Sequence, residues 1–286
     1  MKRKELKCVF ERNLEGLLET VQDTKGDNKY SIITLCNRSF EPLARNWNWY
    51  LNRLNLNNYL TITTNRDTFK SLNYSEIKTF FLNVEGAFSD KSENFGTKNF
   101  SDLTFLKPLL TRYLIHEDMT FLFSDVDTIW LKNPAPHFDD VSDIQMQTDN
   151  PDYFTVEEIL LNAKKEYGLV NTGFFLISPT RQSKIFLDKW INGMVSNPHL
   201  DDQSVFNSIL SEENITPYSD IRLKKTIEPL NIKLLDPLLF PNGSIYFKKN
   251  KGYSQYNASP AVMHVNWARG LEGKINLLKK FNLLRT

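Results

Sequence analysis

The sequence predicts an α/β layer fold with a largely parallel central sheet. Short apolar runs rich in β-branched and aromatic residues alternate with segments of about 10–16 residues that show helical periodicity. Polar side chains follow several of these runs, and in such sheets ligands bind beyond the carboxyl ends of the strands. The 286 residues suffice for one large domain, and no internal repeat, linker or low-complexity tract divides them.

The composition argues against several classes of function. A net charge of +1 gives no global field that would favour nucleic acid or an anionic membrane. Two cysteines, Cys8 and Cys36, are too few for a disulfide framework. The basic start lacks the apolar core of a secretory signal, and no apolar run approaches the ~18 residues of a membrane span. We therefore expect the chain as given to be soluble.

Helices and strands are expected to alternate from the start of the chain. Residues 2–22 place apolar side chains at helical spacing, and Gly26 ends this helix. A second helix is predicted at residues 39–54, with Trp47 and Tyr50 facing inward. β-Type runs predict strands at residues 30–36, 59–64 and 77–82.

The middle of the chain begins with a polar loop at residues 84–97. Helical spacing at residues 100–115, interrupted by Pro108, leads into a buried strand at residues 119–124. A polar and acidic stretch follows at residues 149–158. Further strands are predicted at residues 143–148, 169–178, 232–235 and 261–265, and further helices at residues 181–195, 201–210 and from Leu271 onward.

Two carboxylates, Asp125 and Asp127, follow the strand at residues 119–124. If the strand continues, side chains two residues apart point to the same face. Two acids on one face repel each other unless a cation lies between them, and a hard divalent cation accepts oxygen ligands from carboxylates and substrate phosphates. The alternative is a strand-to-loop turn in which both acids are solvated, because Asp is common in turns.

A bound nucleotide would need such a cation. Asn37 follows the strand at residues 30–36, and neither the dinucleotide fingerprint nor the glycine-rich phosphate loop occurs in the chain. A metal held by Asp125 and Asp127 could hold the phosphates instead.

His264 ends the last apolar strand, where it is either an ordinary core histidine or a third metal ligand. A mixed oxygen and imidazole set suits Mn²⁺ better than Mg²⁺. Gly270 and Lys274 follow, and a lysine near the metal would bind a charged leaving group. The alternative for Lys274 is a solvent-facing lysine in the first turn of the terminal helix.

Polar residues also interrupt the strand at residues 169–178. Gly173 inside an apolar run marks a bulge or a close approach by a ligand, and the amide of Asn171 needs partners that a sugar hydroxyl can supply. Asp202 caps the helix at residues 201–210, whereas Gln203 is less easily explained by capping. A turn is expected at the remaining polar cluster, which comprises Asp149, Asn150 and Asp152.

In this order, the motifs resemble those of the retaining nucleotide-diphospho-sugar glycosyltransferases of family 77, with a more distant likeness to the glycogenin-type transferases. That family includes plant arabinosyl- and xylosyltransferases and α-galactosyltransferases. The resemblance covers roughly residues 30–280 and is carried by Thr34-Leu35-Cys36-Asn37, Phe105-Leu106-Lys107, Ser124-Asp125-Val126-Asp127, Asn171-Thr172-Gly173, Asp202-Gln203, and His264-Val265-Asn266-Trp267 with Gly270 and Lys274. An isolated Asp-X-Asp is a weak signal, but the whole ordered set is specific.

The resemblance implies a GT-A fold, which is a Rossmann-like, three-layer α/β fold with a mixed, mostly parallel central sheet. One domain would span residues 1–286, with an N-terminal helix and lead-in at 1–29 and a catalytic core at 30–280. The implied donor is a UDP-sugar of the galactose, xylose or arabinose class, the implied cofactor is Mn²⁺ or Mg²⁺, and the acceptor is a hydroxyl of a glycan or glycoprotein.

The resemblance also implies a role for each matching residue. The metal ligands would be Asp125, Asp127 and His264. The donor-binding residues would be Thr34, Leu35, Asn37, Lys107, Asp125, Asn171, Gly270 and Lys274. The catalytic residues, which line the sugar pocket or stabilise the leaving diphosphate, would be Asp202, Gln203 and Lys274.

Two mechanisms and two rival functions stay open at this point. Retention is compatible with front-face transfer, which we favour, or with a double displacement in which Asp202 is the nucleophile. A haloacid-dehalogenase-type phosphatase also carries a strand ending in Asp-X-Asp, but normally near the chain start. A non-catalytic sugar-nucleotide-binding protein is the other rival. The compartment would be the cytoplasm if the chain is complete and the Golgi lumen if an anchor was removed, and acceptor contacts are expected from loops such as residues 84–97 and 149–158.

Overall fold

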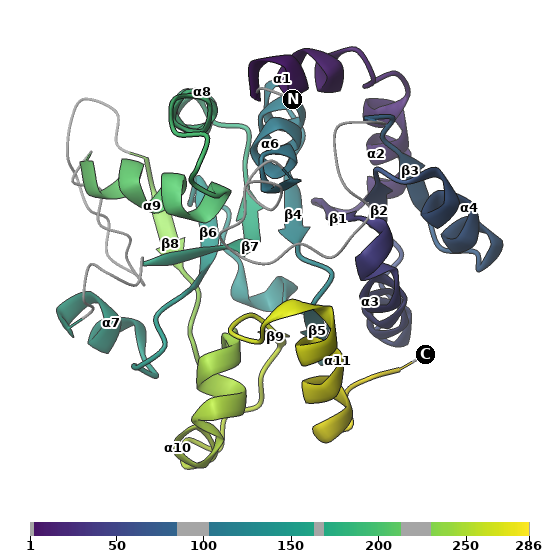
Figure 1. The fold of residues 1–286 in the computed structure, drawn as a ribbon. Helices are drawn as coiled ribbons and strands as arrows, with labels where there is room; N and C mark the ends of the chain where they lie inside the picture. The colour runs from purple at the N-terminus through teal and green to yellow at the C-terminus, as the bar shows by residue number, and fades with distance from the viewer. Residues whose placement is uncertain (1–2, 85–102, 163–168, 213–229, 286) are drawn as a thin grey trace.

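A computed structural model of the protein describes residues 3–84, 103–162, 169–212 and 230–285 (Figure 1). Its centre is a seven-stranded sheet in the order β3-β2-β1-β4-β7-β6-β8. These strands are β1 Ser31–Cys36, β2 Tyr59–Thr63, β3 Thr79–Phe81, β4 Phe121–Ser124, β6 Ile144–Thr148, β7 Val170–Ile177 and β8 Ile232–Leu234. Only β7 runs antiparallel to its neighbours β4 and β6, which confirms the mixed, mostly parallel sheet.

Helices cover both faces of this sheet (Figure 1). One face packs against α1 Arg3–Glu11, α2 Leu17–Lys25, α6 Leu106–His116, α8 Arg181–Ser196 and α9 Asp202–Glu212. The other face packs against α3 Glu41–Arg53 and α11 Gly270–Lys280. The remaining helices are α4 Arg66–Tyr74, α7 Val156–Asn162 and α10 Asn250–Ser254, with 3₁₀ turns η1 Arg38–Phe40 and η2 Ala135–His137 and the π-helix η4 Ser244–Lys248.

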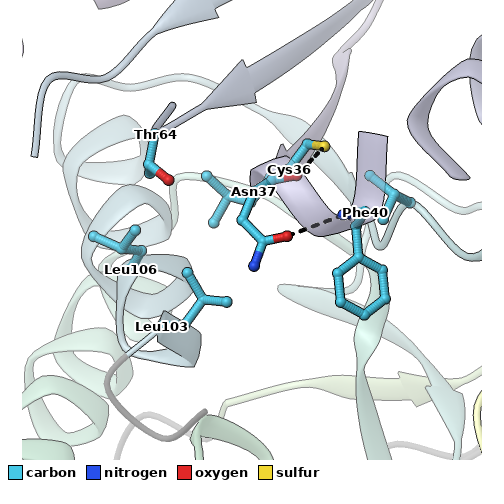
Figure 2. A pocket seen from close by; sticks show the side chains of 8 residues that line it. Cys36, Asn37, Phe40, Thr64, Leu103 and Leu106 are labelled. Atoms are coloured by element: carbon cyan, nitrogen blue, oxygen red, sulfur yellow. Dashed lines mark hydrogen bonds between the residues drawn. The ribbon is translucent and has the colours of Figure 1, made fainter. Parts of the chain in front are cut away.

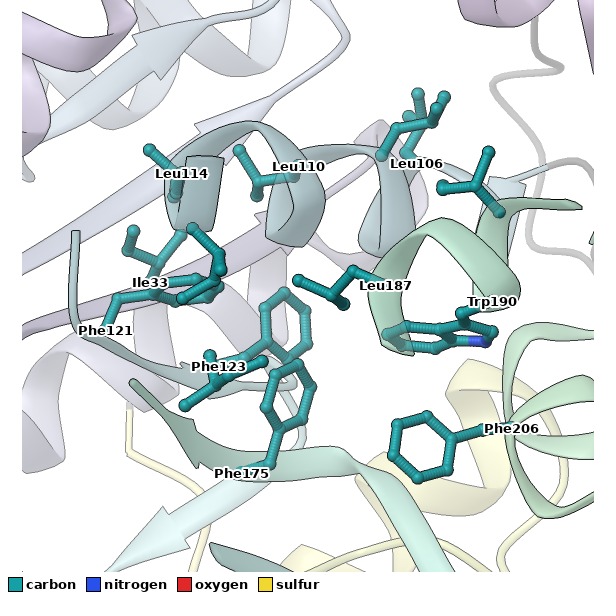
Figure 3. Packing of buried hydrophobic residues seen from close by; sticks show 14 of the residues in the cluster. Ile33, Leu106, Leu110, Leu114, Phe121, Phe123, Phe175, Leu187, Trp190 and Phe206 are labelled. Atoms are coloured by element: carbon teal, nitrogen blue, oxygen red, sulfur yellow. The ribbon is translucent and has the colours of Figure 1, made fainter. Parts of the chain in front are cut away.

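Consecutive strand residues divide between the two cores because their side chains point to opposite faces. In β7, for example, Phe175 joins the first core and Phe174 the second. Figure 3 shows the first core, in which the rings of Phe123 and Phe175 stack with centroids 5.4 Å apart. Leucines of α6 pack from one side, and Leu187, Trp190 and Phe206 pack from α8 and α9.

A second, two-stranded sheet pairs β5 Thr128–Trp130 with β9 Val262–His264 in antiparallel register. Thr128 lies opposite His264, so residues far apart in the sequence meet here. The residues between β4 and β5 form a turn, in which the Thr128 N–H donates to the Asp125 carbonyl at 3.1 Å. The expectation that Asp125 and Asp127 share one face of a continuing strand is therefore wrong, because β4 ends at Ser124.

The N-terminal helix predicted at residues 2–22 is two helices, α1 and α2. The side chain of Asn13 donates to the Val9 carbonyl and the chain turns. Gly16 then adopts a left-handed conformation (φ 74°) that is cheap only for glycine. Gly26 ends α2 as predicted, with its N–H bonded to the Gln22 carbonyl.

The interruption expected at Pro108 falls at Phe105, where a turn separates helical residues 103–104 from α6, and Pro108 itself lies inside α6. It is the third residue of α6, and the first N–H groups of a helix have no intrahelical partner, so its missing N–H costs nothing there. Sequence periodicity also missed four short helices, α4, α7, η4 and α10. α4 buries only Thr68 and Leu72, and η4 and α10 are five residues each, too short for a periodic pattern.

Three predicted elements lie partly outside the described residues, namely the first residue of the helix at 2–22, the loop at 84–97 beyond Val84 and the first residues of the helix at 100–115. The polar stretch at residues 149–158 is described, and α7 begins within it. None of the described helices is long and apolar enough to cross a bilayer.

Candidate active site

Two carboxylates and an imidazole converge at the carboxyl edge of the sheet. One ligand atom each of Asp125, Asp127 and His264 lies within 4.8 Å of the other two. The His264 Nε2 atom is 3.2 Å from Asp127 Oδ1 and 3.8 Å from Asp125 Oδ2. Asp127 and His264 are buried, and about a third of the Asp125 side chain is exposed. These three groups could together hold one cation, and Asp125 stays partly accessible to solvent.

The small β5–β9 sheet brings these three residues together. The Val265 N–H donates to the Asp127 carbonyl at 2.9 Å, and the His264 N–H donates to the Pro241 carbonyl. On the other side, the Asp125 N–H donates to the Gly173 carbonyl at 2.7 Å. Backbone bonds to two different segments therefore fix the turn that carries the two acids, and a third bond fixes His264.

Gln147 fixes the orientation of the histidine ring. Its amide nitrogen donates to the carbonyls of Phe240 and Pro241, so its oxygen faces His264 Nδ1 at 3.2 Å. Nδ1 therefore carries a proton and donates to Gln147, and Nε2 faces the acids, where it could give its lone pair to a bound cation. Sequence reasoning missed Gln147, because a glutamine inside a strand carries no recognisable motif.

Gly173 leaves room for the site. A Cβ atom at this position would overlap the His264 ring and lie 2.5 Å from Asp125 Oδ2 and 2.8 Å from the Asn171 side-chain oxygen. The sequence predicted a close approach or a bulge here. The approaching groups are the site's own side chains, and the pairing of β6 with β7 shifts register nearby, between Met146 and Gln147.

Lys274 lies on the opposite side of Asp127 from the histidine. Its Nζ atom contacts Asp127 Oδ2 at 2.5 Å and the Val265 carbonyl at 3.1 Å. Burial alone would raise the pKa of Asp127, but Lys274 and His264 outweigh burial and hold this pKa well below its usual range. Gly270, with φ 64°, starts the helix that carries the lysine.

Lys107, at the start of α6, is a second buried cation. It lies 3.3 Å from Asp125 and 3.0 Å from Asp202. Burial lowers the pKa of Lys107, but the two carboxylates outweigh it and the net shift is upward. Burial also raises the pKa of Asp125, against the attraction of Lys107 and His264. Lys107 thus connects Asp125, in the turn, with Asp202 at the start of α9.

Asp202 is held from three sides. Besides Lys107, the Thr172 hydroxyl donates to its carboxylate at 2.8 Å, and the Trp190 indole N–H donates to its carbonyl at 2.9 Å. Its neighbour Gln203 faces the same region, and the Thr172 N–H donates to the Gln203 side-chain oxygen at 3.4 Å.

Asp149, which the sequence suggested was a turn residue, is the centre of a buried polar network. Its carboxylate accepts hydrogen bonds from the side-chain amides of Asn171 (3.0 Å), Gln203 (2.8 Å) and Asn266 (2.9 Å). Burial raises its pKa from 3.8 to about 6. The signal that singled out Asp125, an acid directly after a buried strand, was present here too.

A pocket opens beyond the end of β1 (Figure 2). It is lined by Leu35, Cys36, Asn37, Phe40, Thr64, Leu103, Leu106 and Val126. The Asn37 side-chain oxygen accepts the Phe40 N–H at 3.1 Å. Its buried amide nitrogen has no hydrogen-bond partner among the residues that the structure describes. Of the three residues expected near a nucleotide, Leu35 and Asn37 line this pocket and Thr34 does not.

A family model and individual proteins of known function match this chain. The family model described as nucleotide-diphospho-sugar transferase matches residues 54–278. A UDP-D-xylose:L-fucose α-1,3-D-xylosyltransferase of Arabidopsis thaliana is 24% identical over 198 residues, which are 68% of this chain and 53% of that protein. A UDP-galactose:fucoside α-3-galactosyltransferase of Dictyostelium discoideum is 26% identical over 70% of this chain and 30% of its own length. This chain thus spans about half or less of these relatives.

A solved structure shares the fold. The galactosyltransferase LgtC, crystallised with donor and acceptor sugar analogs, superposes with a TM-score of 0.54 at 12% identity. The match covers 90% of this chain and 96% of the other. It confirms the predicted GT-A arrangement.

Proposed function

The chain belongs to the nucleotide-diphospho-sugar transferase family, and we propose that it moves a sugar from a UDP-sugar to a hydroxyl group of a glycan or glycoprotein acceptor. The observation that carries this proposal is the convergence of Asp125, Asp127 and His264, with Lys274 beside them. We further propose that residues 30–280 form the catalytic core, that transfer is metal-dependent, and that the anomeric configuration is retained.

The three residues fit a divalent cation. They offer two carboxylate oxygens and one imidazole nitrogen, His264 Nε2. Gln147 orients the imidazole ring so that Nε2 faces the two carboxylates. Such a mixed set suits Mn²⁺, with Mg²⁺ as the alternative. When bound, the cation would act as a Lewis acid on the diphosphate of the donor.

The donor would lie along the carboxyl edge of the sheet. The pocket at Asn37 fits a planar base, because its walls are mostly apolar and the unpartnered amide nitrogen of Asn37 can donate to a base carbonyl. Asp125 would contact both ribose and cation, and Asp127 would hold the cation and the diphosphate. Asn171, Asp202 and Gln203, connected by Lys107 and Asp149, would line the sugar pocket beyond the cation.

Lys274 would stabilise the leaving group. When the bond between the anomeric carbon and the diphosphate oxygen breaks, its electron pair stays on that oxygen, and a fixed ammonium nearby stabilises the charge. The acceptor oxygen forms the new bond on the same face, and its proton passes to the departing diphosphate oxygen. The contacts of Asp202 support this front-face mechanism. Its carboxylate is paired with Lys107 and accepts a hydrogen bond from Thr172, which makes it a poor nucleophile for a double displacement.

The relatives reported above are named as glycosyltransferases, which favours transfer over the phosphatase alternative. The test is to incubate the protein with UDP-galactose, UDP-xylose and UDP-arabinose in the presence of Mn²⁺, Mg²⁺ or a chelator. We expect UDP release from at least one donor, lost on chelation. Cation-dependent UDP binding without release from any donor would instead favour the non-catalytic alternative. Phosphate release from a phosphomonoester would favour the phosphatase.

A further inference from the structure

Trp267 combines two unfavourable features at one position. It is an aromatic residue in the left-handed region, with φ 64°, where a side chain with a Cβ is strained. It is also one of the exposed large hydrophobic residues among those described, with 37% of its surface accessible. Glycine or asparagine would adopt this backbone at less cost and would expose no indole. Trp267 itself lies three residues after His264 in the sequence.

The indole is nevertheless held in place. Lys248, on the π-helix η4, places its Nζ atom 5.3 Å from the ring centroid. The Trp267 side chain also hydrogen-bonds Asp149, which lowers the pKa of that carboxyl against the larger effect of burial. One face and one edge of the ring therefore have partners, and 37% of the residue's surface stays accessible.

The backbone around the indole is fixed as well. The Gly243 N–H donates to the Asn266 side-chain oxygen, and the Asn266 amide donates to Asp149 at 2.9 Å. The Asn242 amide donates to the Asn150 carbonyl at 2.7 Å. These bonds tie the segment before Trp267 to the end of β6, so the ring is a rigid surface.

The position of the ring excludes the nucleotide base as its occupant. Asn37 and its pocket follow β1, the two acids follow β4, and Asp149 follows β6. β1 and β6 are three strand spacings apart in the sheet, which is roughly 14 Å. Trp267 therefore lies on the far side of the acids from the base pocket.

We propose that Trp267 is a stacking platform for the pyranose ring of the acceptor, which rests on the transfer function proposed above. The C–H face of a pyranose packs on an aromatic ring, and its equatorial hydroxyls find a partner at the ring edge, here the partly buried side chain of Asn266. The acceptor arrives from solvent, as the exposure of Trp267 allows. The residues expected to line the donor-sugar pocket, Asn171 and Asp202, are almost fully buried.

The test compares Trp267→Asn, which tolerates the left-handed backbone, with Trp267→Phe, which keeps an aromatic face. Trp49→Asn is the matched control, because Trp49 is 39% exposed and also packs against cations, Arg53 and Arg285, but lies on α3. Binding of methyl α-L-fucopyranoside and methyl β-D-galactopyranoside to the protein with Mg²⁺ and UDP is measured by saturation-transfer NMR. Because two relatives are named for fucose or fucoside acceptors, the fucoside is the first probe.

We expect saturation of the ring protons of at least one glycoside with the wild type, Trp267→Phe and Trp49→Asn, and a signal about tenfold weaker with Trp267→Asn. We also expect Trp267→Asn to lower the ratio of glycoside transfer to donor hydrolysis about tenfold. Equal glycoside binding by Trp267→Asn and wild type, binding of neither glycoside by the wild type, or an unchanged ratio overturns the proposal. Absence of UDP release from every donor overturns the transfer function, and the binding result is still informative because it requires no turnover.

Discussion

Gln147 and His264 meet inside the protein, with 3.2 Å between the amide oxygen and Nδ1. The glutamine cannot turn its amide around, because its nitrogen already donates to two backbone carbonyls. The histidine is thereby held in the tautomer that leaves Nε2 free to accept a cation.

We therefore expect Gln147→Leu to weaken Mn²⁺ binding by about 10–100-fold, the usual effect of losing a partner behind a metal-binding histidine. Titration of Mn²⁺ followed by electron paramagnetic resonance measures the affinity. Gln145→Leu is the control, because Gln145 is equally buried on the same strand but bonds the Asp139 backbone. Equal loss of affinity in both variants would show that Gln147 acts only through the fold.

Asp127→Asn should abolish both cation binding and transfer. The amide keeps the volume of the carboxylate, but it removes the charge that faces Lys274 and His264. We expect the rate of UDP release to fall at least about 100-fold, since the Lewis acid is lost together with its ligand. The control is Asp140→Asn, which removes an exposed ion pair with Lys29. An Asp127→Asn protein that still turns over would reject the proposed metal site.

Gly173→Ala should block the site without unfolding the protein. Its methyl group would occupy the space between the His264 ring and the Asp125 carboxylate, so these two groups must separate. We expect Mn²⁺ affinity and turnover to fall at least about tenfold. Gly273→Ala makes the same change where a Cβ meets nothing within 4 Å, inside α11. This control should gain about 0.5–1 kcal/mol of stability and keep its activity, and a comparable loss in both variants would contradict the steric explanation.

Asp149 should give the stability of the protein a specific pH dependence. Its pKa rises from 3.8 to about 6 on folding, so between these pH values the folded protein binds more protons at this group than the unfolded chain does. The free energy of unfolding contributed by Asp149 therefore falls as pH rises from about 4 to about 6, and is constant above that. Urea unfolding measures the free energy of unfolding of the wild type and of Asp149→Asn across this range. The wild-type value minus the variant value should fall as the pH rises from about 4 to about 6. A difference independent of pH would mean that the buried carboxyl titrates normally.

Trp190→Phe should disturb the site from within the core. The indole of Trp190 is buried in the first core (Figure 3). Its N–H donates to the backbone carbonyl of Asp202, where α9 begins. Loss of ring volume and of this bond should cost about 1–3 kcal/mol, and the released start of α9 should slow transfer about tenfold. Phe186→Leu, in the same helix, is the control for core volume. If Phe186→Leu loses as much stability as Trp190→Phe and slows transfer by the same factor, the hydrogen bond to Asp202 has no separate role.

The strands of the central sheet that the structure describes were predicted from the sequence with small errors at their ends. Their apolar runs are short and bounded by polar residues, and burial on both faces makes such runs easy to identify. Asp125, Asp127 and His264, which the structure brings together, could be singled out because they lie at or just after the ends of such runs. The break between α1 and α2 was not predicted, because apolar spacing continues across Asn13 and Gly16.

What the sequence could not indicate are contacts that depend on register and packing. Asp149 and Gln147 act through partners between 22 and 117 residues away, and no local pattern connects them. The turn after β4 was one of the two alternatives, but its return into a second sheet was not foreseen, because Thr128 to Trp130 have the composition of a strand that continues.

Asp127 and His264 are 137 residues apart in the chain, and they meet only because β5 pairs with β9. Closing so long a loop is entropically costly, so we expect this pairing to form late in folding, after the local α/β units. A cation that binds between these residues then stabilises the finished structure and not its precursors. Metal in the medium would therefore slow unfolding much more than it accelerates folding.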